Sequence, residues 1–262
     1  MINIPQNRKL VAALAVRNQG SRLYGKPLQN LHIESGKTIL SNIIDCLDTV
    51  RCISDIVLGI AEGVDNSTFI KYAKNASLSF IEGDEIDVLG RLITCGEKVD
   101  ATDIFRITSE SPFPSYGFIN EAWEQHLTTN ADATFFDDVV DGCGFEIIKL
   151  DALKKAHKDG EDRHRSELCT LYLRENADQF DLMKVDAPLR FNRKDLRLTV
   201  DNPEDLILCK AVYKNFIEMA PKIPLDKIIE FLDMNPELIE LTKSLTEVGY
   251  ESMYLWRDDE KK

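Results

Sequence analysis

The apolar stretch KLVAALAV, residues 9–16, decides the fold because it runs directly into the polar loop RNQGSRLYGKP, residues 17–27. An apolar run of this length that ends at a glycine-containing loop is typical of a buried strand. The loop brings together three cations and two glycines: Arg17, Arg22, Lys26, Gly20 and Gly25. Glycines let backbone amides approach a ligand closely, and the cations supply the charge that a polyphosphate needs. The pattern predicts a phosphate-binding loop after the first strand, with a solvated surface loop as the alternative.

Strand-like and helix-like segments alternate outward from this point. Further strands are expected at residues 55–61, 78–81 and 103–107, and helices at 38–50, 66–75, 87–99 and 116–127. Such alternation predicts a parallel sheet that helices cover on both faces. Right-handed crossovers then bring the loops at the carboxyl ends of the strands together, where ligands bind in folds of this class.

The second half of the chain is less regular. Strands are expected at residues 145–150 and 195–200, and helices at 166–175, 203–220, 225–233 and 236–245. The sequence contains no internal repeat, low-complexity tract or clear linker. We therefore expect one domain over residues 1–262, with a core of about residues 9–220 and C-terminal helices at about residues 224–247.

Composition narrows the classes of function. The chain has 262 residues, of which 32 are basic and 45 acidic, so its formal net charge is −13. A chain that is 44% hydrophobic has enough apolar area to fold, and its negative charge argues against nucleic acid as a partner. No apolar run approaches the roughly 18–20 residues that span a bilayer, and residues 1–9 lack a signal-peptide core. We expect a cytoplasmic protein whose six cysteines stay reduced.

A competing motif overlaps the cationic loop. Residues 20–26 also fit the pattern G-x-x-x-x-G-K of phosphate-loop phosphotransferases. That motif requires Ser or Thr next to hold magnesium, whereas this chain has Pro27. Proline also disfavours helical geometry at the preceding Lys26, where the phosphate loop should enter a helix. A phosphate-loop enzyme is thus the less favoured alternative.

Four motifs resemble those of a known family. Residues 17–26 resemble the signature R-x-G-S-x-R-L-x-G-K of the cytidylyltransferases that activate acidic sugars, above all the spore coat polysaccharide biosynthesis protein F family. CMP-KDO and CMP-acylneuraminate synthetases are its relatives. The resemblance continues, in family order, in GDEIDVLGR at residues 83–91, RITSESP at 106–112 and LRLTVDNPEDL at 196–206.

The resemblance implies a fold and a reaction. The fold is α/β, of the nucleotide-diphospho-sugar transferase type (GT-A-like, Rossmann-like), a mixed sheet flanked by helices with a helical C-terminal tail. In the reaction an acceptor hydroxyl attacks the α-phosphate of CTP, pyrophosphate leaves, and an acidic sugar or similar acceptor receives CMP for surface polysaccharide synthesis. The implied partners are CTP and a small anionic acceptor, and a homodimer is possible. Such a transfer needs positioning and positive charge more than covalent chemistry.

The resemblance also assigns roles to single residues. The catalytic phosphate-binding cations are Arg17, Arg22 and Lys26. Nucleotide-binding residues are Ala15, Gly20, Ser21, Asp87, Arg91 and Arg106. For Asp87 and Arg91, a capped helix with a solvated arginine remains the alternative. Acceptor binding falls to Glu146, Arg165 and Glu167, although Gly144 stands where the family has an aspartate and Leu168 where it has a histidine.

Two acids are expected to bind Mg²⁺, or Mn²⁺ in its place. Glu110 and Asp201 each follow an expected strand, and the family carries a metal-binding acid at each position. Magnesium prefers carboxylate and phosphate oxygens and keeps several waters. Glu110 replaces the usual aspartate and Ser109 a glycine. The alternatives are a surface acid at Glu110 and a helix N-cap at Asp201.

These departures leave other functions open. The second hypothesis is a nucleotidyltransferase of the same fold that uses another NTP or a non-sugar acceptor, for example a phosphorylated one. The third is a non-catalytic nucleotide-binding protein, against which the retention of the three loop cations and Asp201 argues.

Overall fold

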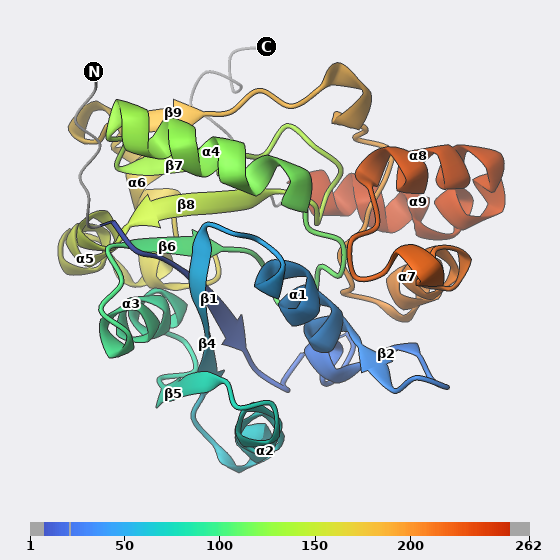
Figure 1. The fold of residues 1–262 in the computed structure, drawn as a ribbon, viewed down its shortest axis with the longest axis horizontal. Coiled ribbons are helices and arrows are strands. Elements are labelled where there is room, and N and C mark those ends of the chain that lie inside the picture. The colour runs from blue at the N-terminus through green and yellow to red at the C-terminus, as the bar shows by residue number, and fades with distance from the viewer. Residues whose placement is uncertain (1–7, 21, 252–262) are drawn as a thin grey trace.

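The fold is built around one seven-stranded mixed sheet (Figure 1). The computed structural model describes residues 8–20 and 22–251. The strand order is β5-β4-β1-β6-β8-β7-β9. The bounds are β1 (Leu10–Val16), β4 (Ile53–Ala61), β5 (Ser79–Gly83), β6 (Asp103–Arg106), β7 (Ala133–Phe136), β8 (Phe145–Lys149) and β9 (Leu182–Lys184). The α/β fold predicted from the sequence is confirmed.

Only the first half of the sheet is parallel throughout. Strand β1 pairs in parallel with β4 on one side and β6 on the other, and β4 pairs in parallel with β5. Strand β8 instead runs antiparallel to both β6 and β7. Only residues 137–144 join β7 to β8, whereas a crossover between parallel strands needs a dozen or more residues. The parallel sheet expected from the alternating first half of the chain is therefore found there, and antiparallel β8 makes the whole sheet mixed, as the family resemblance implies.

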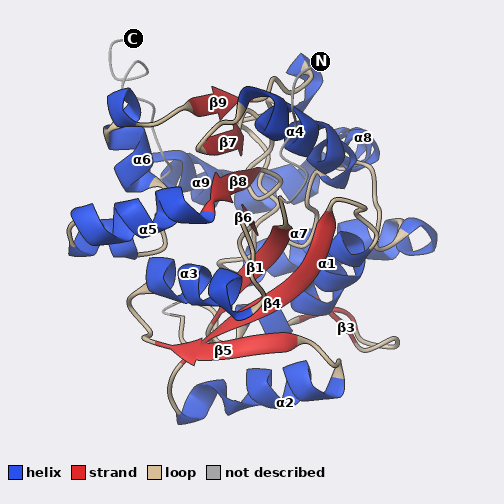
Figure 2. Ribbon diagram, turned by 60° about the vertical axis from the view of Figure 1, so that its left-hand side comes forward, coloured by secondary structure: helices blue, strands red, loops and turns tan. Residues whose placement is uncertain are grey.

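Helices cover both faces of the sheet (Figure 2). They are α1 (Ile39–Asp48), α2 (Ser67–Asn75), α3 (Val88–Lys98), α4 (Tyr116–Thr129), α5 (Leu150–Asp159), α6 (Leu171–Glu175), α7 (Pro203–Asn215), α8 (Leu225–Met234) and α9 (Pro236–Glu251). Side chains of β1 alternate between the two faces. Leu14 packs into a core with α1, α4, α7 and α8, and Val11 packs into a second core with α3, α5 and α6. Burial on both faces explains why β1 is apolar throughout.

Several expected elements differ from the observed ones. Residues 195–200 form no strand within the described chain and contribute only the isolated bridge between Asp141 and Arg197. The helix expected at 166–175 begins only at Leu171, and α7 ends at Asn215 rather than near 220. The sequence analysis missed β7, β9 and the hairpin of β2 (Asn30–His32) and β3 (Lys37–Thr38). These strands are short, so their pairing partners rather than their own pattern define them.

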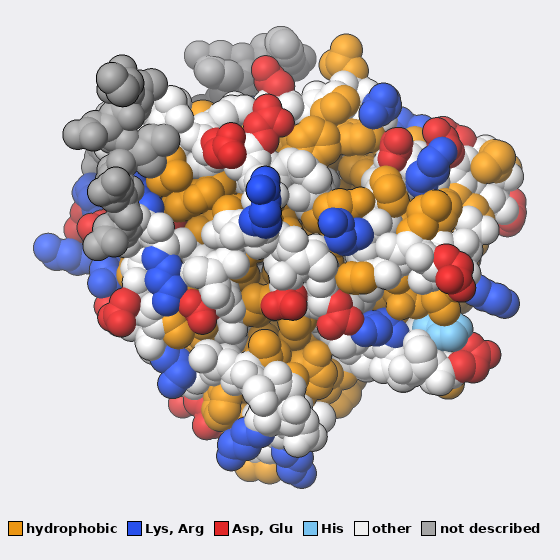
Figure 3. All heavy atoms as spheres, viewed as in Figure 1, with side chains coloured by type: hydrophobic (Ala, Val, Ile, Leu, Met, Phe, Trp, Pro, Cys, Tyr) orange, Lys and Arg blue, Asp and Glu red, His pale blue; other side chains and the backbone are white. Residues whose placement is uncertain are grey.

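The surface charge, helix hydrophobicity and cysteines of the described residues can be compared with the expectations from composition. On the face seen in Figure 3, acidic and basic side chains are interspersed among the described residues and do not gather into one basic area. No described helix is both long and apolar enough to cross a membrane. The six cysteines are all free, and five of them are buried.

Candidate active site

The loop after β1 is held in a folded-back shape by two contacts of Asn18. The backbone N–H of Asn18 donates to Oδ1 of Asn66 (2.7 Å), and its carbonyl accepts from the N–H of Gly25 (2.8 Å). Gly25 adopts the left-handed conformation, with φ of 61°, which a residue without a Cβ adopts without strain. The turn brings Lys26 back toward the end of β1.

The local geometry differs from that of a phosphate loop. Residues Lys26–Leu28 form only a 3₁₀ turn, with Pro27 in its first turn, and the chain then enters β2. A phosphate loop leads into the N-terminus of an α-helix, whose amides bind the phosphates. The structure therefore argues against the phosphate-loop alternative.

A cavity of about 370 Å³ opens beside this loop at the carboxyl ends of β1 and β6. Ten of the predicted site residues line it: Ala15, Arg17, Gly20, Arg22, Lys26, Arg91, Arg106, Glu110, Glu167 and Asp201. Ser21, also predicted to bind nucleotide, lies outside the described residues. The lining contains five cationic and three acidic side chains, a local positive excess in a protein of net charge −13. Such a local field attracts an anionic ligand whatever the overall charge.

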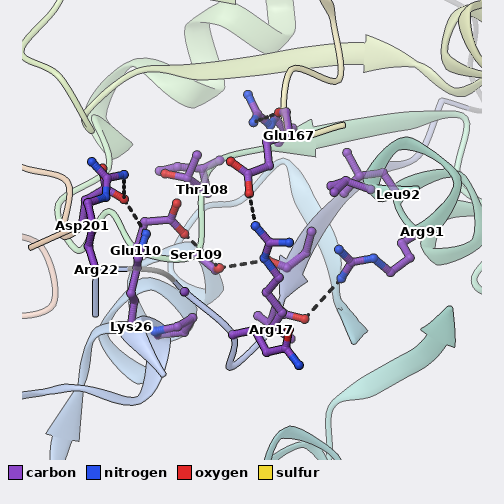
Figure 4. A pocket seen from close by; sticks show the side chains of 18 residues that line it. Arg17, Arg22, Lys26, Arg91, Leu92, Thr108, Ser109, Glu110, Glu167 and Asp201 are labelled. Atoms are coloured by element: carbon purple, nitrogen blue, oxygen red, sulfur yellow. Dashed lines mark hydrogen bonds and ion pairs between the residues drawn. The ribbon is translucent and has the colours of Figure 1, made fainter. Parts of the chain in front are cut away.

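Asp201 and Glu110 approach each other through their backbones. The N–H of Val200, which precedes Asp201, donates to the carbonyl of Glu110 (3.0 Å). On the Asp201 side chain, Oδ1 contacts Lys26 Nζ at 2.5 Å and Arg22 Nη2 at 3.4 Å. Figure 4 shows Arg22, Lys26, Glu110 and Asp201 together at one end of the cavity, with Arg91 at the other. The structure thus joins the two predicted metal acids to two of the predicted phosphate-binding cations.

The two carboxyl groups have opposite pKa shifts. Burial opposes the ionisation of Asp201, but Lys26 outweighs it, with help from Arg197 and Arg22, and holds the pKa of Asp201 below its ordinary value. Burial raises the pKa of Glu110, and the nearby carboxylate of Asp201 raises it further against the opposing charge of Lys26. Asp201 is therefore stabilised as an anion, while Glu110 lacks comparable compensation.

The donor set fits a magnesium ion that binds together with phosphates. No group of three His, Cys, Asp or Glu residues within the described chain could hold a metal ion. The cavity offers only the carboxylates of Glu110 and Asp201 at its cationic end. Magnesium is commonly held by one or two carboxylates, with phosphate and water oxygens completing its octahedron. Glu110 needs such a charge, because the only hydrogen bond that its carboxylate accepts from the described residues is a long one from Ser109 Oγ (3.3 Å).

Glu146 supports the cavity from behind rather than lining it. Its buried carboxylate accepts hydrogen bonds from Thr170 (2.6 Å) and Arg174 (3.1 Å) and contacts Arg106 at 3.1 Å. Arg106 also donates to the backbone carbonyl of Glu167 (2.9 Å). The structure thus gives Glu146 an orienting contact with Arg106, and direct acceptor binding by Glu146 stays a prediction.

The structure also defines the contacts of three more predicted site residues, Asp87, Arg165 and Arg91. Asp87 caps α3 by accepting from the N–H of Gly90 (2.7 Å) and contacts His157 at 2.6 Å, and it lies outside the cavity lining. Arg165 also lies outside the lining and donates to the carbonyl of His157 (3.2 Å). Arg91 is buried and donates to the carbonyls of Gly59 (2.7 Å) and Val16 (3.2 Å). Asp87 therefore caps α3 and Arg91 is buried rather than solvated, while nucleotide binding by either residue stays a prediction.

Glu167 and Arg17 both line the cavity and contact each other. Their side chains form an ion pair and point toward each other in Figure 4. Both are predicted site residues. Their contact could not be predicted from local sequence patterns, because 149 residues lie between them in the chain.

The sequence analysis missed some contributors. Asn18 fixes the loop, Gln19 and Thr108 line the cavity, and Arg197 pairs with Asp201. A signal for Arg197 was available, because a charged residue between Leu196 and Leu198 interrupts an apolar run. Such a residue is buried only when it is paired.

The sequence has relatives among known proteins, although no family model matches it. It is 25% identical over 242 residues to the uncharacterized protein MJ1063 of Methanocaldococcus jannaschii, which covers 92% of this chain and 98% of that one. It is 27% identical over 157 residues to the spore coat polysaccharide biosynthesis protein SpsF of Bacillus subtilis, covering 59% of this chain and 65% of SpsF.

Solved structures share the fold at low identity. A cytidylyltransferase from Leptospira borgpetersenii superposes with a TM-score of 0.79 at 20% identity, covering 89% of this chain and 97% of that one. A CMP:2-keto-3-deoxy-manno-octonic acid synthetase complexed with CTP superposes with a TM-score of 0.58 at 16% identity, covering 79% and 99%. The motif resemblance is thereby confirmed: the chain has the nucleotidyltransferase fold and is similar in sequence to SpsF.

Proposed function

We propose that the protein is a metal-dependent cytidylyltransferase that transfers CMP from CTP to an acidic sugar or a similar anionic acceptor and releases pyrophosphate. The product would be an activated precursor of a surface polysaccharide. The observation that carries this proposal is the convergence of Lys26, Arg22, Glu110 and Asp201 at one end of a cavity at the carboxyl ends of the strands. The relation to SpsF and the shared fold with two enzymes of cytidylyl transfer support it.

In the proposed reaction the acceptor hydroxyl oxygen forms a bond to the α-phosphorus of CTP and releases its proton to water. The bond from that phosphorus to the oxygen bridging to the β-phosphate breaks, and the electron pair leaves with pyrophosphate. Lys26 and Arg22 would bind the leaving phosphates. Because both cations are already in position before the reaction begins, they would stabilise the negative charge that grows on these phosphates in the transition state. Glu110 and Asp201 would hold Mg²⁺ or Mn²⁺, which supplies positive charge to phosphate oxygens when it is bound.

The part of the cavity lined by Arg17, Arg106 and Glu167 suits an anionic acceptor. Arg17 pairs with the Glu167 side chain, and Arg106 donates to the Glu167 carbonyl. An acceptor carboxylate would compete with the Glu167 side chain, which is 69% exposed, for Arg17. The acceptor hydroxyl would then be held near the α-phosphate, which is where positioning contributes most to the rate.

Isotope transfer tests the reaction class. The protein is incubated with Mg²⁺, each NTP in turn and a panel of sugar acids and sugar phosphates. With CTP and a sugar acid, we expect label from the α-phosphate in the acceptor product and label from the γ-phosphate in pyrophosphate. Transfer of the γ-label to the acceptor would identify a phosphotransferase instead. Nucleotide binding without transfer from any NTP would favour the non-catalytic alternative, and transfer from another NTP would favour the second hypothesis.

The conformation of Gly25 gives a further prediction. In Gly25→Ala, the left-handed backbone costs about 1–2 kcal/mol of stability, and the new Cβ lies 3.3 Å from Asn18 Oδ1. We expect this loss in chemical denaturation together with weaker binding of CTP, because Lys26 follows directly. Gly36→Ala is the matched control, since Gly36 has φ of 64° and no heavy atom within 4 Å of the added Cβ. Equal CTP affinity in both variants would contradict the role of the loop.

A further inference from the structure

Arg197 is a buried cation that contacts Asp201 and does not line the cavity. Its side chain is 4% exposed, and its guanidinium contacts three carboxylates. Nη1 donates to Asp141 Oδ2 (2.6 Å), Nε donates to Asp205 Oδ1 (3.1 Å), and Nη2 donates to Asp201 Oδ2. Each nitrogen therefore binds a different acid, and only one of these acids lines the cavity.

The two other acids are themselves fixed to the backbone. Asp205 Oδ2 accepts from the N–H groups of Asp201 (2.9 Å) and Asn202 (2.8 Å) at the start of α7. The carbonyl of Asp141 accepts from the N–H of Leu198 (2.8 Å). Because a guanidinium is planar and holds its donors in a rigid fork, these anchors fix the direction in which Nη2 meets Asp201.

The two carboxylate oxygens of Asp201 therefore have different partners. Oδ2 is bound by Arg197 from behind, and Oδ1 faces Lys26 and Arg22 in the cavity. We propose that Arg197 is a positioning residue that holds Asp201 with Oδ1 directed at the bound divalent cation, and that helix α9 keeps Arg197 in place through Gly249. This inference rests on the proposed function, because it concerns the metal of the same site.

Gly249 is the point where α9 meets this group. A Cβ added to Gly249 would lie 2.5 Å from Arg197 Nη1 and 3.7 Å from Asp141 Oδ2. Only a residue without a side chain allows the helix to approach the guanidinium so closely. Helix α9 also packs against α7, whose first turn contains Asp205. The C-terminal helix therefore covers Arg197 on the side away from the cavity.

Two kinds of variant test this role: substitutions of Arg197 itself, and a substitution of Gly249 that leaves Arg197 present. Arg197→Met removes the charge, while Arg197→Lys keeps it but offers one ammonium in place of three directed nitrogens. Gly249→Ala retains Arg197 and pushes on the end of its flexible side chain, so the fold is expected to survive. Gly117→Ala is the matched control, because Gly117 lies in α4 and an added Cβ has no heavy atom within 4 Å.

The test measures Mn²⁺ binding by electron paramagnetic resonance in the presence of a non-hydrolysable CTP analogue. Loss of a residue that orients a metal ligand typically weakens metal binding by about 10–100-fold. We expect a loss of this size in Arg197→Met, a smaller loss in Arg197→Lys and in Gly249→Ala, and none in Gly117→Ala. Binding of the analogue without metal should stay within about twofold, because Lys26 and Arg22 remain.

The outcomes separate this inference from the proposed function. If wild-type protein binds Mn²⁺ with the analogue and folded Gly249→Ala and Arg197→Lys bind it equally well, Arg197 does not position Asp201 and only this inference fails. If Arg197→Met does not fold, Gly249→Ala and Arg197→Lys still decide the question. If wild-type protein binds no Mn²⁺ with the analogue, the proposed metal site fails, and the inference fails with it.

Discussion

Lys26→Met is expected to lower the turnover of cytidylyl transfer by about 10²–10³-fold, the usual scale for removing one preorganised electrostatic contact. Lys26 lines the cavity, and its Nζ lies 2.5 Å from Asp201 Oδ1, the oxygen that Arg22 also contacts. Methionine keeps much of the length and loses the charge. Because the lost contact is to charge that grows in the transition state, kcat should fall more than the KM for CTP rises.

A matched control separates this effect from a general loss of charge. Lys37→Met also removes a partly buried lysine, but Lys37 pairs with Asp45 in a region outside the cavity lining. We expect near-normal kinetics for Lys37→Met and cooperative unfolding for both variants. Near-normal turnover in Lys26→Met would contradict the assignment of Lys26 to the leaving phosphates.

Asp201→Asn is expected to raise the Mg²⁺ concentration needed for half-maximal activity by at least about 100-fold, since residues that only orient metal ligands already cost up to that much. The amide keeps nearly the same shape and removes one negative charge from the site. It also leaves Lys26, Arg22 and Arg197 without the carboxylate they share. The nucleotide should therefore bind as well as before, or more tightly, when metal is absent.

The measurement is activity against Mg²⁺ concentration, together with CTP binding in chelator. Asp195→Asn serves as the control, because Asp195 pairs with Arg193 in an exposed position of the same segment. Glu110→Gln should show a weaker effect in the same direction, since Glu110 is the less stabilised anion. Full activity of wild-type protein in chelator would remove the metal from the mechanism, whereas an unchanged Mg²⁺ requirement in Asp201→Asn would remove Asp201 from the metal site.

Local sequence patterns determined the first half of the fold. An apolar run followed by a cationic, glycine-containing loop predicted β1 and its loop, and both lie where expected. Thr38 and Asp87 accept hydrogen bonds from the first turns of α1 and α3, contacts that involve residues only three apart. Such features depend on neighbours in the chain, so the sequence alone suffices to predict them.

The second half depended on partners that are distant in the chain. The apolar run at residues 195–200 resembles a strand, yet its backbone lies against the loop of Asp141 and bonds to Glu110. Strand β8 is antiparallel because its connection to β7 is short. No periodicity within either segment contains this information, since it lies in loop length and in the pairing edge that the sheet leaves available.

The features of the site also fall into those that local sequence predicts and those that only tertiary contacts decide. The cations of the loop cluster within ten residues, and that spacing alone predicted a phosphate-binding role. Tertiary structure alone decided that Lys26 meets Asp201, 175 residues further on, and that Glu146 lies behind Arg106. It alone also placed Arg197 between Asp141, Asp201 and Asp205. Removing three acids and a cation from water is costly, and the fold offsets that cost with opposite charges and backbone N–H groups from distant parts of the chain. No local pattern in the sequence can express this condition.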